Sequence, residues 1–186
     1  MVPLSSLLVP ILLSAVIVFV ASSIIHMVLT YHRSDFRGLA KEDEVMEAIR
    51  RAGVPPGDYM APHAGSMAGM KDPGFVERMK RGPILIMTVA PGGAPSMAAP
   101  LAMWFGYSLL VSLFAGYIAS RALGPTAYYL DVFRFVGTSA FMGYSFGLLQ
   151  NSIWYKRNWG TTLKSVFDGL VYALLTAGTF GWLWPR

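Results

Sequence analysis

The chain has 186 residues, of which 54% are hydrophobic and only 13% are charged. A soluble domain carries about 25% charged residues, so this composition indicates a protein that sits in lipid. The formal net charge is +5, but residues 31–81 hold nine of the 15 basic residues and eight of the 10 acidic ones, a balance that argues against a nucleic-acid partner. The sequence contains no cysteine, which excludes disulfides, iron–sulfur clusters and thiolate metal sites.

The first predicted element is a transmembrane helix over residues 3–30, an apolar run in which His26 is the only titratable side chain. About 20 apolar residues cross the hydrocarbon core of a bilayer, so this run is long enough to cross with some tilt. The first ten residues lack the basic region of a signal peptide. We therefore expect the segment to stay in place as a membrane anchor.

Residues 31–96 are predicted to form one extramembrane insertion of mixed structure. Within it, residues 41–52 have acidic residues at the start and arginines at the end, which is the charge pattern of a helix. A second short helix is predicted over residues 72–80, with Asp72 as its cap and Pro73 at its first position.

The rest of the insertion is less regular in pattern. The Gly-, Pro- and Met-rich stretch over residues 54–70 is expected to be irregular. The apolar residues 83–90 fit either a strand or a segment at the membrane interface, because a run this short has no decisive periodicity. Residues 91–95 are predicted to form a turn.

Three further transmembrane helices are predicted over residues 97–121, 128–154 and 165–184, with residues 156–164 as a polar link before the last one. Aromatic residues stand at both ends of the third span, as expected for side chains at the two membrane interfaces. The sequence thus predicts an all-α membrane protein, a four-helix transmembrane bundle with a mixed-structure extramembrane insertion.

The distribution of basic residues predicts the orientation of this bundle. Most of the lysines and arginines near the spans belong to the insertion and the 156–164 link, which four spans place on one side. Basic residues in short flanks favour the cytoplasm. We therefore expect the insertion in the cytoplasm and both termini on the opposite side of the membrane.

Small residues recur at every fourth position in three of the predicted spans. Positions four apart share one helix face, and small side chains there let another helix approach closely within lipid. These faces are predicted to pack helices together, and they comprise Ser108, Ser112 and Gly116, then Ser139, Gly143 and Gly147, and finally Gly169, Ala173, Ala177 and Gly181.

Four titratable residues inside the spans are candidate functional groups: His26, Asp131, Arg134 and Asp168. Because charge is costly in lipid, such residues suggest a proton or ion path, but all four lie near helix ends. We favour structural pairing, between Asp131 and Arg134 and between Asp168 and Lys164 one turn earlier. For His26 we favour a hydrogen-bonded side chain, since no other span carries a second histidine, and haem or bacteriochlorophyll ligation stays open.

A weaker metal candidate lies in the insertion, where Met60, His63, Met67 and Met70 offer thioether and imidazole groups. These groups suit monovalent copper, but the spacing is loose, and methionines also serve as adaptable packing residues. Common catalytic motifs such as Walker A, GxSxG and HExxH are absent from the sequence. We therefore predict that the protein is not an enzyme, and we predict no cofactor.

The segments YHRSDFRGL, PPGDYMAP and MKDPGFVERMKRGP resemble a family of uncharacterised bacterial integral membrane proteins. The resemblance implies a bacterial inner membrane and no known activity. In that membrane, the orientation predicted from the basic residues makes both termini periplasmic. We expect a non-catalytic accessory or scaffold subunit of a larger membrane complex, in contact with lipid and with other membrane subunits. The alternatives are a small oligomeric transporter or channel and a Met/His copper-handling protein.

Overall fold

The computed structural model describes residues 1–94 and 96–185, so the last residue of the predicted 91–95 turn lies outside the described residues. The chain divides into two compact units, and each is described by itself below. The first unit contains residues 1–36 and the chain from Ser96 onward, and the second unit is the segment Arg37–Pro95 between them.

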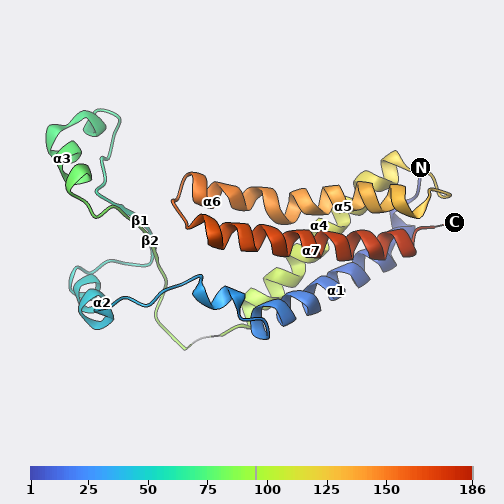
Figure 1. Ribbon diagram of the computed structural model, residues 1–186, viewed down its shortest axis with the longest axis horizontal. Coiled ribbons are helices and arrows are strands. Elements are labelled where there is room, and N and C mark those ends of the chain that lie inside the picture. The colour runs from blue at the N-terminus through green and yellow to red at the C-terminus, as the bar shows by residue number, and fades with distance from the viewer. Residues whose placement is uncertain (95, 186) are drawn as a thin grey trace. The chain divides into compact units, whose positions relative to one another are not determined.

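The first unit is a bundle of long helices (Figure 1). Helix α1 spans Leu8–Met27 and follows a 3-10 turn, α4 spans Ala98–Ala122, and α7 spans Trp159–Trp182. Helix α5 spans Tyr129–Ser145 and passes through a 3-10 turn into the short helix α6, Leu149–Ile153. The predicted 128–154 span is therefore interrupted near its end.

Helix α7 differs from its prediction at its start. It begins at Trp159 and not near residue 165, because the side chain of Asn158 accepts a hydrogen bond from the Gly160 amide and caps the helix. Residues 159–164 of the predicted polar link therefore form the first turns of α7, and residues 156–158 precede it. The predicted start near residue 165 followed the hydrophobicity of the sequence, whereas the helix itself begins at its cap.

Among the described residues, three helical stretches are long and apolar enough to cross a membrane: Leu4–Met27, Ala98–Ala122 and Tyr129–Ile153. Four such stretches were expected, and α7 does not qualify. Its 24 residues include Lys164, Asp168 and several glycines and threonines, which lower its hydropathy. The fold is mostly helical with three apolar spans, and α7 packs beside them.

Helices α5 and α7 lie side by side, and small residues let them approach (Figure 1). A Cβ atom added to Gly169 would lie 3.2 Å from Cβ of Tyr144, and one added to Gly181 would lie 2.7 Å from the ring of Tyr129. Ala173 and Ala177 on the same face of α7 are also buried. The small-residue face of α7 therefore lies inside the bundle.

The two other predicted small-residue faces, on α4 and on α5, differ in how far they are buried. Ser108, Ser112 and Gly116 on α4 are all buried, and Gly116 lies against the ring of Phe180. On α5 the buried residues at four-residue spacing are Val132, Val136, Ala140 and Tyr144. Of the small residues predicted there, Ser139 is half-buried, Gly143 would place a Cβ 3.2 Å from Val111, and Gly147 has nothing within 4 Å.

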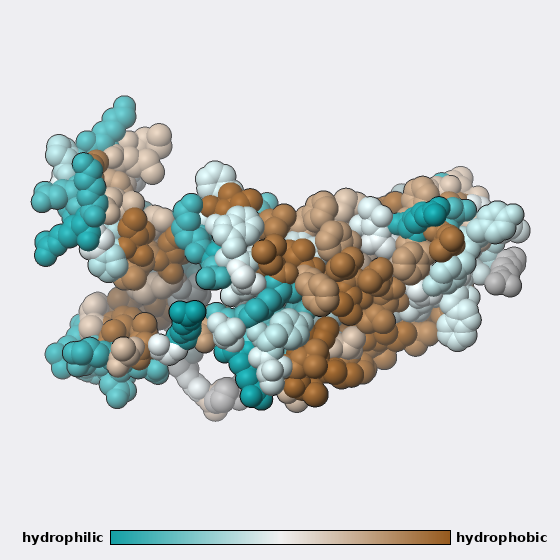
Figure 2. Space-filling model, viewed as in Figure 1, coloured by the Kyte–Doolittle hydropathy of each residue, from teal (hydrophilic) through white to brown (hydrophobic). Residues whose placement is uncertain are grey.

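The outward surface of the bundle is apolar. Large side chains that remain exposed include Leu8, Val20, Phe114 and Leu174. Hydrophobic residues cover much of the visible face of the bundle in Figure 2. An apolar exterior around a packed helical interior fits a protein whose surroundings are lipid.

The second unit contains helices α2, Glu42–Arg51, and α3, Pro73–Arg81, with strands β1, Gly57–Ala61, and β2, Leu85–Val89. The strands pair antiparallel, with Tyr59 opposite Met87. Both predicted helices are confirmed, and the strand alternative holds for residues 83–90. The expectation that residues 54–70 are irregular is wrong for β1, whose partner lies about 30 positions later. None of residues 37–94 is buried.

Candidate functional site

A cluster of polar side chains joins the end of α1 to the first half of α7. Asp168 on α7 is only 3% exposed, although its side chain is a carboxyl group. The chain leaves α1 after Met27 and enters a 3-10 turn over Tyr31–Ser34, which places the following residues against α7. We call this cluster the charged site, and its members are His26, Tyr31, His32, Asp35, Lys164 and Asp168.

His32 lies between two carboxylates. Its Nδ1 is 2.6 Å from an oxygen of Asp35, and its Nε2 is 2.8 Å from an oxygen of Asp168. Each ring nitrogen of His32 therefore lies at hydrogen-bond distance from a carboxylate, which accepts a hydrogen bond when it is ionised. The ring bridges the turn after α1 to α7. The hydroxyl of Tyr31 donates a hydrogen bond to the second oxygen of Asp168.

Lys164 completes the charge balance of the site. Its Nζ donates to Oδ1 of Asp35 at 2.9 Å, to the carbonyl oxygen of Tyr31 at 2.5 Å and to Oγ of Ser34 at 2.9 Å. An ammonium group has three donors, and all three are used here. The two carboxylates therefore face the ammonium group of Lys164 and the imidazole ring of His32.

The surroundings shift the pKa values of Asp35 and Tyr31, two members of the charged site that lie outside the membrane-spanning helices. Burial alone would raise the pKa of Asp35, but hydrogen bonds and charge from His32 and Lys164 outweigh it and hold this pKa below its ordinary value. Burial, followed by the hydrogen bond to Asp168 and its charge, raises the pKa of Tyr31 well above its ordinary value. The Tyr31 hydroxyl therefore keeps its proton and acts as a donor.

His26 lies directly over His32. The two rings are stacked with centroids 4.6 Å apart and an interplanar angle of 9°. Nδ1 of His26 is 3.0 Å from the carbonyl oxygen of Ser22, which can only accept, so this nitrogen donates the hydrogen bond. Nε2 is the ring nitrogen that remains to act as a ligand. One potential ligand atom from each of His26, His32 and Asp168 lies within 4.8 Å of the others.

The sequence had identified only part of this site. His26 and Asp168 were singled out as separate residues, whereas His32 and Asp35 were not, and Lys164 pairs with Asp35 instead of the expected Asp168. The available signal was the cluster of polar side chains directly after an apolar span. Asp131 and Arg134 approach each other to 3.7 Å at an exposed position. Both lie at the start of α5, outside the charged site.

The Met/His residues of the insertion lie in the second unit. Met60 is in β1 opposite Ile86, and Met70 is in a 3-10 turn over Gly69–Lys71. Met67 lies in the loop with 77% of its surface exposed. Such open positions provide none of the burial and oriented hydrogen bonding that the charged site provides.

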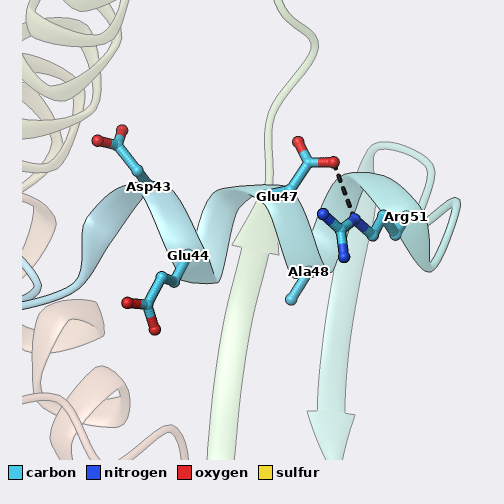
Figure 3. Close-up of a pocket in the computed structure, with 5 residues that line it drawn as sticks. All are labelled: Asp43, Glu44, Glu47, Ala48 and Arg51. Atoms are coloured by element: carbon cyan, nitrogen blue, oxygen red, sulfur yellow. Dashed lines mark hydrogen bonds and ion pairs between the residues drawn. The ribbon is translucent and has the colours of Figure 1, made fainter.

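A shallow hollow beside α2 is lined by residues of that helix alone: Asp43, Glu44, Glu47, Ala48 and Arg51 (Figure 3). Glu47 accepts a hydrogen bond from Nε of Arg51 at 3.0 Å, one helical turn away. The side chains are exposed and point in different directions around the helix (Figure 3). This hollow is a solvated face of α2, and we assign it no ligand.

The fold and the charged site together define a helical bundle with three apolar spans and a His/Asp/Lys network in which Asp168 is buried. The chain matches no family model, and no significant match is found among curated proteins or solved structures.

Proposed function

We propose that the chain is an integral membrane protein that binds a divalent transition-metal ion through His26, His32 and Asp168. The observation that supports this proposal is the convergence of two imidazoles and one carboxylate within 4.8 Å. Two imidazoles with a carboxylate are ligands typical of Zn²⁺ and of non-haem Fe²⁺, whereas Mg²⁺ and Ca²⁺ prefer oxygen alone.

The geometry needs only a local adjustment to take an ion. Tetrahedral Zn²⁺ with bonds of about 2.0 Å holds its ligand atoms about 3.3 Å apart. The rings of His26 and His32 are stacked, so the ring of His26 has to tilt toward Asp168 for the three side chains to reach one ion. His26 lies at the exposed end of α1, where such a tilt meets little resistance. Three protein ligands leave one position open for water or a substrate.

The residues behind the ligands also suit a metal site. The Ser22 carbonyl and the Asp35 carboxylate hold Nδ1 of the two histidines, which directs each Nε2 toward the ion. Tyr31 holds the second oxygen of Asp168. A nitrogen that binds a metal ion carries no proton, so Nε2 of His32 has to be free of a proton when the ion is bound.

We further propose that α7 crosses the membrane as a fourth span. Its charged residues Lys164 and Asp168 point into the charged site and not toward lipid. The amide of Val2 donates to the carbonyl of Ser120, and the indole of Trp184 donates to the carbonyl of Gly124, so both ends of the chain lie beside the α4–α5 turn. Basic residues around the opposite end favour a cytoplasmic insertion and periplasmic termini in a bacterial inner membrane.

Calorimetric titration of the purified full-length chain with Zn²⁺ tests the metal proposal. We expect one ion per chain, and loss of binding in His26→Ala, whose side chain contributes little to the fold. His63→Ala, which changes the one other histidine of the sequence, is the matched control and retains binding. Binding that survives His26→Ala but is lost in His63→Ala would move the site to the Met/His loop and overturn the proposal.

The accessory-subunit role is a second candidate, supported by exposed aromatic side chains on the bundle. Phe114 is 58% exposed and Phe167 is 59% exposed. Lipid or a neighbouring subunit can cover such side chains. Purification in a mild detergent separates the two: a partner subunit appears as a stoichiometric second band, whereas lipid contact alone yields the lone chain.

A further inference from the structure

Helix α3 in the second unit is a short helix with well-defined ends. The side chain of Asp72 accepts a hydrogen bond from the amide of Phe75 at 2.8 Å, and Pro73 occupies the first helical position. Gly82 ends the helix with a φ of 63°, a left-handed conformation that favours glycine. The nine residues between these two signals therefore hold fixed positions around the helix axis.

The apolar residues of α3 gather on one face. At 100° per residue, Phe75, Val76 and Met79 share about a third of the circumference, and Arg78 and Lys80 lie at its two borders. None of these side chains is buried by the rest of the chain, and Val76 is 36% exposed. This face is therefore free to contact something outside the second unit.

We propose that this face of α3 lies on the surface of an anionic lipid membrane. Residues 71–81 carry four basic and two acidic side chains, a net charge of +2. Lysine and arginine at the borders of an apolar face can lay their stems along lipid while their charged groups reach the phosphates. The charge of the helix and the charge of the lipid headgroups are thus complementary.

Helix α2 provides an internal comparison. It is also amphipathic, with Val45, Met46 and Ile49 among its apolar residues. Residues 41–51, however, carry four acidic and three basic side chains, a net charge of −1. An anionic surface repels this helix. The proposal therefore applies to α3 and does not extend to α2.

The covalent connections of the insertion make weak binding sufficient. Its two ends continue into α1 and α4, both of which are apolar enough to span a membrane. The inference rests on the proposed membrane location, because a tethered helix meets the lipid surface at a high effective concentration. A single short helix would bind only weakly if it were free in solution.

The absence of cysteine allows a direct test in the full-length chain. Val76→Cys is labelled with a polarity-sensitive fluorophore, and the chain is reconstituted into vesicles of phosphatidylcholine, with or without phosphatidylglycerol. We expect a blue-shifted emission only with phosphatidylglycerol, reversed at high salt. Val45→Cys on α2 is the matched control and keeps a water-like emission in both vesicles.

A charge variant makes the test decisive. Arg78→Gln combined with Lys80→Gln and Arg81→Gln should abolish the blue shift at Val76→Cys without affecting reconstitution. The proposal is overturned if the emission is the same with and without phosphatidylglycerol, because the contact would then not depend on anionic lipid. Failure of membrane insertion is seen separately, as chain that does not float with the vesicles.

Discussion

Lys164 and Asp35 form an ion pair with a distance of 2.9 Å, although 129 positions separate them in the sequence. The same ammonium group also holds the carbonyl of Tyr31, so it ties the turn after α1 to the start of α7. We infer that this pair fixes the position of His32 between its two carboxylates. The pair therefore supports both the packing of the bundle and the charged site.

Replacing Lys164 with methionine should destabilise the bundle by about 1–3 kcal/mol, because Asp35 is largely buried and loses a charged hydrogen-bond donor. Thermal unfolding in detergent, followed by circular dichroism, measures the change. Arg134→Met is the matched control: its pair with Asp131 is exposed and 3.7 Å long, so its loss should change stability by less than about 1 kcal/mol. Equal effects of the two variants would contradict the assigned role of Lys164.

Asp35→Asn should weaken Zn²⁺ binding by about 10–100-fold while leaving the ion's direct ligands in place. The reason is that the carboxylate orients His32 through Nδ1 and increases its basicity. Titration calorimetry gives the affinity, and the stoichiometry should remain one ion per chain. An unchanged affinity would show that Asp35 acts only in packing.

Ala177→Leu should cost about 1–3 kcal/mol of stability, because extra methylene groups do not fit a closed helix contact. Ala177 is fully buried, and a Cβ atom on Gly137 of the neighbouring helix α5 would lie only 3.1 Å from it. Gly147→Ala has open space around it and serves as the control. A chain with Ala177→Leu that folds as stably as the parent would place this face of α7 outside the bundle.

The proposed fourth span places the two ends of α7 on opposite sides of the membrane. Single-cysteine variants Arg157→Cys and Leu183→Cys flank the helix, and the parent chain has no cysteine that would react. A membrane-impermeant maleimide should label Leu183→Cys in intact bacterial cells whose outer membrane is permeable, and Arg157→Cys only after lysis. Labelling of both variants from the same side would exclude a fourth span.

Tyr172→Phe should leave stability unchanged or slightly improved, because its buried hydroxyl has no hydrogen-bond partner among the residues that the structure describes. The aromatic ring, which packs edge-on against Tyr144 with centroids 5.6 Å apart, is retained in phenylalanine. Thermal unfolding provides the measurement. A loss of more than about 1 kcal/mol would instead indicate that the hydroxyl binds an ordered water.

The sequence predicted those features that depend on neighbouring residues. Helix α3 followed from Asp72 and Pro73, which act within one turn, and the apolar spans followed from composition. The charged site was not predicted as a unit because His32 and Asp168 are 136 positions apart, and no local pattern brings them together. Strand β1 was missed for a related reason, since its regular structure depends on β2.

The second unit has no buried residue between positions 37 and 94. This affects how the chain responds to proteolysis and to substitutions. A segment without a buried core unfolds locally at little free-energy cost. A protease should therefore cut there first and leave the helices of the bundle intact. Substitutions in this insertion likewise have little packing to disturb. The bundle and the insertion can therefore vary independently, with the stability of the protein residing almost entirely in the bundle.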